Sequence, residues 1–127
     1  MKVVTAGIIY DNSGKVLIVR RGPKESLSGF WEFAGGKVEQ GESEKECLKR
    51  ELKEELGIEV NVGDFIEESR YVYEHGEFML RAFKTDIISG EIHLSVHDDL
   101  AWVEPDELQS FKLAPADIPI AIKLTNK

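Results

Sequence analysis

Acidic side chains gather in one short segment, residues 36–58, with the sequence GKVEQGESEKECLKRELKEELGI. Within it, Glu51, Glu54 and Glu55 stand at i, i+3 and i+4, a spacing that places side chains on one face of a helix. Like charges at that spacing destabilise an isolated helix by roughly 0.2–0.5 kcal/mol per pair, and a divalent cation removes this penalty. Carboxylate oxygens suit Mg²⁺ or Mn²⁺, hard ions that also hold phosphate oxygens. The spacing therefore predicts a Mg²⁺ site, with Mn²⁺ as the alternative ion, and chemistry on phosphates.

Arg50 and Glu42 are placed to support this acidic face. Arg50 lies one turn before Glu54 and can hold a carboxylate in a bidentate pair. Glu42, just ahead of the helix, is the candidate partner across the loop. Taken alone, the run ELKEEL is more typical of an ordinary solvated helix face of mixed charge. The loop that precedes the helix shifts the interpretation towards a site.

The helix that positions these residues is predicted over 44–56. Ser43, followed three residues later by Glu46, forms a capping box, and Gly57 stands where a left-handed C-terminal cap belongs. One apolar stripe is made of leucines at every fourth position, Leu48, Leu52 and Leu56. The carboxylate face adjoins this stripe, so we expect the acidic groups at the border of the core.

Strands are expected before this helix. Residues 3–10 are rich in β-branched and small apolar side chains, which is typical of a strand. The turn DNSG then predicts a hairpin whose returning strand is 15–21. A loop over 22–29 and an extended piece over 30–36 lead to the helix.

Further strands are expected after the helix. Residues 58–94 indicate several strands separated by turns at Gly63, at His75–Gly76 and at Ser89–Gly90. A short strand over 100–105, a brief helical turn and a final helix with Pro119 in its first turn complete the chain. Together these elements predict a mixed sheet with one or two helices packed on it, either α+β or an α/β/α sandwich.

Length and composition bound the class of protein. The 127 residues are enough to bury a core as one domain, 1–127. The single cysteine, Cys47, excludes an intramolecular disulfide and fits a reducing cytosol. We see no apolar run long enough to cross a membrane and no signal segment, so we expect no membrane partner and a cytoplasmic location. The net charge of −8 disfavours polymeric nucleic acid as a partner, although on charge alone the acidity serves solubility.

The spacing of the acidic segment resembles the Nudix box: Gly, five residues, Glu, seven residues, Arg-Glu, an aliphatic residue, any residue, Glu-Glu, any residue, Gly and an aliphatic residue. Every fixed position is filled, by Gly36, Glu42, Arg50, Glu51, Leu52, Glu54, Glu55, Gly57 and Ile58. The segments GIIYDNSGKVLIVRR, WEFAGGKVE and LAPADIP resemble the MutT-type branch of the Nudix hydrolases, especially its CTP pyrophosphohydrolases. The resemblance covers essentially the whole chain. It implies the Nudix α/β/α sandwich and cleavage of a nucleoside triphosphate to a monophosphate and pyrophosphate.

The resemblance also implies the roles of the acidic residues. Glu51, Glu54 and Glu55 match metal-binding carboxylates, and the carbonyl of Gly35 completes the shell. The matched catalytic group consists of two of these carboxylates and the supporting pair, Glu51, Glu54, Arg50 and Glu42. The metal would act as a Lewis acid and charge clamp, and one carboxylate would orient or deprotonate the attacking water.

Four further residues match substrate contacts. Arg21 and Lys37 match contacts to phosphate, whereas Phe33 matches a position that packs on the base. Asp117, in LAPADIP, matches a base-reading position that is asparagine in the 8-oxo-dGTP-cleaving relative. An ionised aspartate only accepts hydrogen bonds, so it favours a base that presents an amine, such as the N4 amino group of cytosine. A protonated aspartate would also donate, Asp117 could instead cap a helix, and Phe33 could equally belong to the core.

One position departs from the family pattern. Relatives often place a glutamate, followed by histidine, a few residues before the Trp of the segment AWV, and here that position is Val96. Asp98 and Asp99 offer carboxylates nearby, shifted along the loop and shorter by one methylene. The helix glutamates are therefore the expected ligands and base. His97 keeps the family's place and is interpreted as structural.

Alternative functions remain open at this point. The chain could cleave 8-oxo-dGTP, a nucleotide sugar, ADP-ribose or a dinucleoside polyphosphate, although we see no extra domain or side motif for the last three. A ligand-binding regulator that has lost catalysis would be expected to lose a metal-binding glutamate, and all are present. A bare interaction module would not explain the box. The expected partner is a small nucleoside triphosphate, and the chain is expected to be a monomer or a homodimer.

Overall fold

The computed structural model describes residues 1–74 and 76–125. Its elements follow one another in the order β1 (Lys2–Ile9), β2 (Val16–Arg21), β3 (Trp31–Glu32), β4 (Gly35–Lys37), α1 (Glu44–Leu56), β5 (Glu59–Tyr73), β6 (Gly76–Ser89), β7 (His97–Val103), the 3-10 helices η1 (Pro105–Ser110) and η2 (Pro115–Asp117), and α2 (Ile118–Thr125). Among these residues, no helix is both long enough and apolar enough to cross a membrane.

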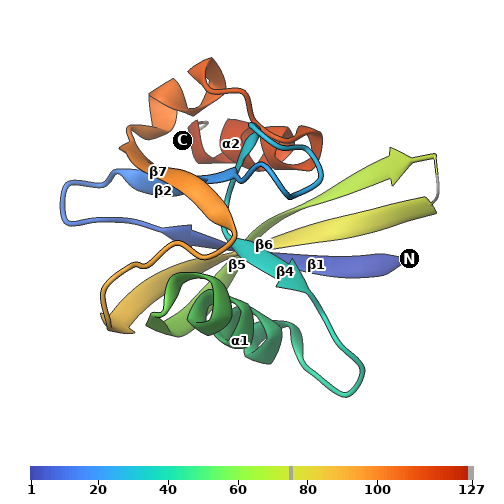
Figure 1. Ribbon diagram of the computed structural model, residues 1–127, viewed down its shortest axis with the longest axis horizontal. Coiled ribbons are helices and arrows are strands. Elements are labelled where there is room, and N and C mark those ends of the chain that lie inside the picture. Colours follow the sequence, from blue (N-terminus) through green and yellow to red (C-terminus); the bar gives the residue numbers. More distant parts are fainter. Residues whose placement is uncertain (75, 126–127) are drawn as a thin grey trace.

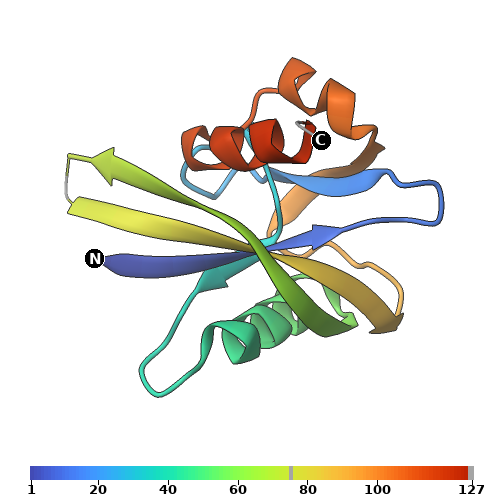
Figure 2. The same cartoon turned by 180° about the vertical axis from the view of Figure 1, so that it is seen from behind.

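The strands form two sheets that lie between two helices. A four-stranded mixed sheet has the order β4-β1-β6-β5, in which β1 and β6 are parallel, and a three-stranded antiparallel sheet has the order β3-β2-β7. Helix α1 lies on one side of the strands, whereas α2 lies on the other together with η1 (Figures 1 and 2). This arrangement confirms the predicted α/β/α sandwich.

The expected hairpin of the first two strands is wrong. β1 and β2 belong to different sheets, and among the described residues one isolated bridge, Tyr10 to Val16, joins the two segments. The turn itself forms as expected, because the Asp11 carboxylate accepts the N–H groups of Ser13 and Lys15 at 2.9 Å each. Both strands are buried on their two faces, so each pairs with strands from elsewhere in the chain and the turn carries the chain from one sheet to the other.

The turn expected at Gly63 is also wrong, because Gly63 lies inside the long strand β5. β5 pairs with β6 along nearly its whole length, with register shifts between Val62 and Phe65 and again before Glu67. A β-bulge of this kind bends a strand without ending it. The turn expected at Gly76 falls where β6 begins, whereas His75 lies outside the described residues.

Two apolar cores fill the two sides of the sheets. Val16 and Ile18 of β2 face the core that contains Ile120 and Leu124 of α2. The alternate residues of β2 face the second core, which is closed by the leucine stripe of α1, Leu48, Leu52 and Leu56. The strand therefore shows the period-two alternation of a layer buried on both faces.

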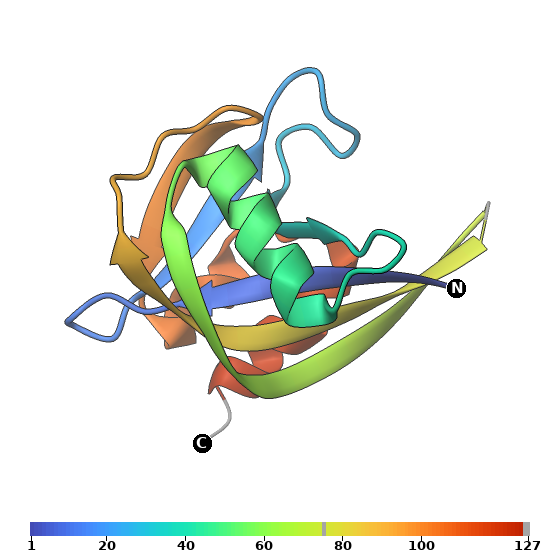
Figure 3. The same ribbon diagram turned by 90° about the horizontal axis from the view of Figure 1, so that it is seen from below.

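Helix α1 has the boundaries and caps that its sequence predicts. The Ser43 hydroxyl accepts the Glu46 N–H at 3.1 Å, the Glu46 carboxylate accepts the Ser43 N–H at 2.9 Å, and Gly57 has a φ of 72°. The helix lies across β1 and β4, as seen in Figure 3. Gly7 of β1 permits this close approach, because a Cβ there would lie 3.2 Å from Leu52 Cδ1.

Candidate active site

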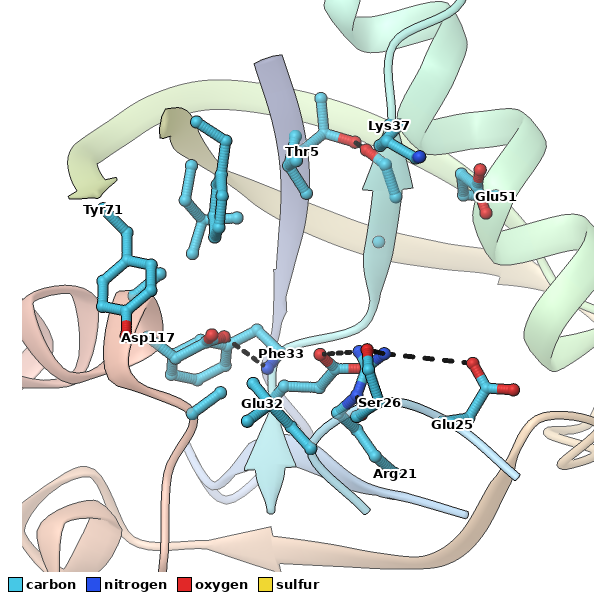
Figure 4. Close-up of a pocket in the computed structure, with 18 of the residues that line it drawn as sticks. Thr5, Arg21, Glu25, Ser26, Glu32, Phe33, Lys37, Glu51, Tyr71 and Asp117 are labelled. Carbon is cyan, nitrogen blue, oxygen red and sulfur yellow. Dashed lines mark hydrogen bonds and ion pairs between the residues drawn. The ribbon is translucent and has the colours of Figure 1, made fainter. Parts of the chain in front are cut away.

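A cavity of about 670 Å³ opens between the strands and α1. The sequence-predicted residues that line it are Arg21, Phe33, Gly35, Lys37, Glu51, Glu55 and Asp117. Figure 4 shows Glu51 on α1 and Lys37 on β4 at one end, and Asp117 with Tyr71 at the other. Glu42, Arg50 and Glu54 lie beside the cavity and are not part of its wall within the described residues.

The glycines of β4 bring α1 and β1 against the cavity. A Cβ on Gly35 would lie 1.9 Å from the carbonyl oxygen of Thr5, and a Cβ on Gly36 would lie 2.2 Å from Cδ of Glu51. Any larger residue at either position would push these groups apart. The two glycines therefore set the place of the Glu51 carboxylate, whose side chain is 15% exposed.

Arg50 binds the acidic groups on the outer side of α1. Its Nε and Nη2 atoms donate to the two carboxylate oxygens of Glu42 at 2.6 and 3.1 Å, which is the bidentate pair that the sequence predicts. Its Nη1 donates to Glu51 at 3.1 Å and to Glu54 at 3.2 Å. The hydrogen bonds from Arg50 lower the pKa of Glu42 to about 2. Arg50 thus links the loop before α1 to two carboxylates of the helix.

Glu54 and Glu55 differ although they are neighbours. The Glu54 side chain is 59% exposed and paired with Arg50. Glu55 lies at the cavity, and its Oε1 is buried without a hydrogen-bond partner among the described residues. Burial first, and then the negative charges of Glu51 and Glu32, raise the pKa of Glu55 to about 8. Of the three glutamates predicted to share one helix face, Glu51 and Glu55 therefore line the cavity and Glu54 does not.

The residues present fit a divalent cation. A buried carboxylate oxygen without a partner, next to a second carboxylate, is costly unless a positive charge is supplied. Within the described part of the chain, no three His, Cys, Asp or Glu side chains are already gathered closely enough to hold a metal ion. Arg50 binds one oxygen of Glu51 and one oxygen of Glu54, so the second oxygen of each carboxylate would be the one to share an ion with Glu55.

Asp117 closes the opposite end of the cavity. Its side chain is 5% exposed, and its Oδ2 accepts the N–H of Phe33 at 3.0 Å. Burial, followed by the charge of Glu32, raises the pKa of Asp117 well above its usual value. Within the described residues this carboxylate bonds to the backbone between β3 and β4 and not to the first turn of α2, so the cap interpretation is wrong. Phe33, 3% exposed, is both a core residue and a wall of the cavity.

The carboxylates after Val96 do not reach the cavity. Asp98 accepts a hydrogen bond from Arg20 Nε at 2.7 Å, and Asp99 lies 4.0 Å from Arg20 Nη1. Neither lines the cavity, to which this segment contributes Val96 and His97. Asp98 and Asp99 therefore do not replace the glutamate that relatives carry at the position of Val96.

Sequence reasoning missed Glu32. Its carboxylate lines the cavity, accepts from Arg21 Nη1 at 2.8 Å and lies 2.9 Å from His97 Nε2. The available signal was a glutamate between Trp31 and Phe33 in an apolar strand, where a charge needs a partner. Tyr71 of β5, which also lines the cavity near Asp117, had no comparable signal (Figure 4).

The chain is similar to known proteins over most of its length. Residues 1–124 match the NUDIX domain family. The chain is 40% identical over 120 residues to the CTP pyrophosphohydrolase of Escherichia coli (strain K12), covering 94% of this chain and 87% of that protein. It is 32% identical over 111 residues to the 8-oxo-dGTP diphosphatase of Buchnera aphidicola subsp. Schizaphis graminum (strain Sg), covering 85% of this chain and 81% of that protein.

A solved structure shares the arrangement of the whole chain. The solution structure of the E. coli ORF135 protein superposes with a TM-score of 0.86 and 38% sequence identity, covering 98% of this chain and 89% of that one. The family match spans nearly all of the described residues, including both ends of the cavity. The chain therefore belongs to the Nudix hydrolase family.

Proposed function

We propose that this protein is a Mg²⁺-dependent nucleoside triphosphate pyrophosphohydrolase that acts on cytosine nucleotides, CTP, dCTP or 5-methyl-dCTP. Water attacks a phosphorus atom, a P–O bond of the anhydride breaks, and a nucleoside monophosphate and pyrophosphate leave. One observation carries the proposal: a single cavity joins the carboxylates of α1, the basic residues Arg21 and Lys37, and the pair Phe33 and Asp117. Its volume of about 670 Å³ is in the range of small-ligand sites.

The acidic end of the cavity is the place for the metal. Glu51, Glu54, Glu55 and the carbonyl of Gly35 would hold it, and the ion would supply Lewis acidity and neutralise phosphate charge. Mn²⁺ is the alternative ion, because it accepts the same oxygen ligands. Either Glu51 or Glu54 takes up the proton of the attacking water, and the Glu42–Arg50 pair holds these carboxylates in place.

The basic residues bind the phosphates. Arg21 and Lys37 line the same cavity as Glu51, so both can contact a polyphosphate that reaches the carboxylates. Positioning and charge neutralisation supply most of the rate enhancement in phosphoryl transfer, because the protein contributes little covalent chemistry. Their removal is therefore expected to weaken turnover as well as binding.

Asp117 and Phe33 select the base. Phe33 packs on a base without regard to its identity, whereas Asp117 reads an edge. An ionised Asp117 accepts from the N4 amino group of cytosine, which favours CTP and its relatives. The high similarity to a protein named CTP pyrophosphohydrolase supports this choice.

A second candidate substrate is 8-oxo-dGTP. The raised pKa of Asp117 favours its protonated form, which donates as well as accepts and so imitates asparagine. The similarity to a protein named 8-oxo-dGTP diphosphatase supports the same substrate.

A substrate panel with pyrophosphate detection tests both candidates. We expect release from CTP, dCTP or 5-methyl-dCTP with Mg²⁺, none with EDTA, and recovery when Mg²⁺ is added again. Asp117→Asn should shift the ratio of dCTP to 8-oxo-dGTP turnover towards 8-oxo-dGTP; an unchanged ratio would rule out base reading by Asp117. Nucleotide binding without release from any member of the panel would indicate a non-catalytic regulator.

A further inference from the structure

Three side chains from three strands meet at the rim of the cavity. Arg21 ends β2, Glu32 lies on β3, and His97 opens β7. The Glu32 carboxylate accepts from Arg21 Nη1 at 2.8 Å through Oε1, and its Oε2 lies 2.9 Å from His97 Nε2. All three residues line the cavity, and Figure 4 shows Glu32 against the Arg21 guanidinium.

A β-bulge brings these side chains to one face. β2 and β7 pair Arg20 with Asp99 but Arg21 with His97, so Asp98 is an extra residue on β7. A bulge of this kind re-aims the side chains beside it, often next to an active site. The extra residue, Asp98, pairs with Arg20 away from the cavity, whereas His97 joins Arg21 on the cavity side.

Glu32 has both of its oxygens engaged. The side chains of Arg21, Glu32 and His97 are 23%, 17% and 2% exposed. Such shielding makes a charge-assisted hydrogen bond stronger than on an open surface. Glu32 is therefore held between two partners and is not free to act as a base.

The Arg21 guanidinium is fixed from two sides. Besides the bond to Glu32, its Nε donates to the carbonyl of Ser26 and its Nη2 to the Ser26 hydroxyl. These bonds use three of the five N–H donors of a guanidinium, and Glu25 forms a longer ion pair, with its Oε1 3.9 Å from Nη2. Within the part of the chain described, two N–H donors are therefore without a hydrogen bond. A long side chain fixed in advance loses less freedom when it binds a phosphate.

We propose that Glu32 and His97 are positioning residues for phosphate binding: Glu32 fixes the guanidinium of Arg21, and His97 fixes Glu32. In this proposal both residues act through Arg21 and not through contact with the substrate. This inference rests on the proposed function, which assigns Arg21 to the phosphates.

A double-mutant cycle tests the role of Glu32. The dissociation constant of a non-hydrolysable CTP analogue is measured by calorimetry with Mg²⁺ present, and kcat and KM are measured for CTP. Glu32→Ala should raise the dissociation constant and KM by about tenfold, with a smaller change in kcat. In an Arg21→Ala background the same substitution should change them by less than about twofold, because Glu32 acts only through Arg21.

An equal effect of Glu32→Ala in both backgrounds would overturn the proposal and make Glu32 an independent contact. If Glu32→Ala does not fold, the cycle is repeated with Glu32→Gln, which keeps the shape of the side chain. The dissociation constant should again rise in the wild-type background and change less in the Arg21→Ala background. If the wild type binds the analogue but releases no pyrophosphate, hydrolysis fails as the function while the binding cycle still decides the positioning role.

His97 is tested by loss and rescue. His97→Ala should raise the dissociation constant, whereas His97→Gln, whose amide can donate to Glu32, should stay within about twofold of the wild type. Asp98→Asn is the matched control, since it removes an ion pair from the same strands away from the cavity, and it should leave the dissociation constant unchanged. A lower melting temperature in His97→Ala with unchanged binding would show that His97 is structural only.

Discussion

Glu55 is the acidic residue of this site that most needs a cation. It has a buried oxygen without a partner in the described part of the chain and a pKa of about 8. In the unfolded chain the same carboxyl group has its ordinary pKa of 4.5. As pH rises, the unfolded chain therefore loses this proton first, and folding is disfavoured in the window between those two values.

Glu55→Gln is expected to stabilise the metal-free protein. Below pH 4.5 both states of the wild type hold the proton, so the variant should gain little there. Between pH 4.5 and about 8 the wild type loses stability and the variant does not. At pH 8 the free energy of unfolding of the variant should be higher by about 2–4 kcal/mol in EDTA, as measured by urea denaturation.

With Mg²⁺ present, the wild type should be more stable than Glu55→Gln. The ion binds to and stabilises the folded wild type, whereas the variant lacks one of the carboxylate ligands. Glu54→Gln is the control: its carboxylate is largely exposed, so its stability in EDTA should stay close to that of the wild type. A Glu55→Gln protein less stable than the wild type in EDTA at pH 8 would contradict the account of Glu55.

At the scale of residues, the sequence predicted which residues belong to the acidic face of α1, but not which of them are buried at the cavity. The helical spacing of Glu51, Glu54 and Glu55 was enough to place them on one face. Which of them enters the cavity depends on how α1 meets β4, and that depends on the space left by Gly35 and Gly36, which a helical projection does not contain. Glu32 was missed for a similar reason, since both of its partners come from other strands.

Helix α1 could be predicted in full because its signals are local. The cap residues and the leucine stripe lie within the helix or directly beside it, so they can be recognised without knowing the rest of the fold. The pairing of β1 with β6 instead of β2 joins residues far apart in the chain, for which turn chemistry at residues 11–14 gives no information. Gly63 lies at a bulge of β5, and its residue type alone does not separate a bulge from a turn, since an isolated glycine is compatible with both.

Ser43→Ala tests the contribution of the capping box. The substitution removes the hydroxyl that accepts the Glu46 N–H, and it should lower the free energy of unfolding by about 1 kcal/mol. Ser43→Thr keeps a capping oxygen and should lose much less. Glu51 and Glu54 lie two turns or more further on, and Glu42, directly before Ser43, keeps its pair with Arg50, so kcat at low temperature should be nearly unchanged in both variants. Equal stability of Ser43→Ala and Ser43→Thr would show that the box does not hold the start of α1.

At the scale of the whole molecule, the negative charge of the protein opposes the binding of a negatively charged polyphosphate in the cavity. The net charge is −8, and the cavity that would receive a polyphosphate is lined by more acidic than basic side chains, namely Glu25, Glu32, Glu39, Glu51, Glu55 and Asp117 against Lys2, Arg21 and Lys37. The composition indicated the acidity and the resemblance indicated the sandwich. The division of the strands into two sheets could not be predicted, because it depends on pairing between strands that are far apart in the sequence. Residues of β1 and β4 contribute to the wall of the cavity. A triphosphate entering this cavity alone meets net repulsion, and a cation shared with the carboxylates converts it into attraction.

Metal and nucleotide should therefore bind with positive coupling. We expect the dissociation constant of a non-hydrolysable CTP analogue to fall by about tenfold or more when Mg²⁺ is present, and that of Mg²⁺ to fall by the same factor when the analogue is present, since coupling is reciprocal. Titration calorimetry of each ligand with and without the other measures both factors. NaCl at matched ionic strength is the control, because screening weakens the long-range field of the acidic protein without supplying an ion to the site. If NaCl reproduced the effect of Mg²⁺, the coupling would come from the net charge of the molecule and not from carboxylates that share an ion with the phosphates.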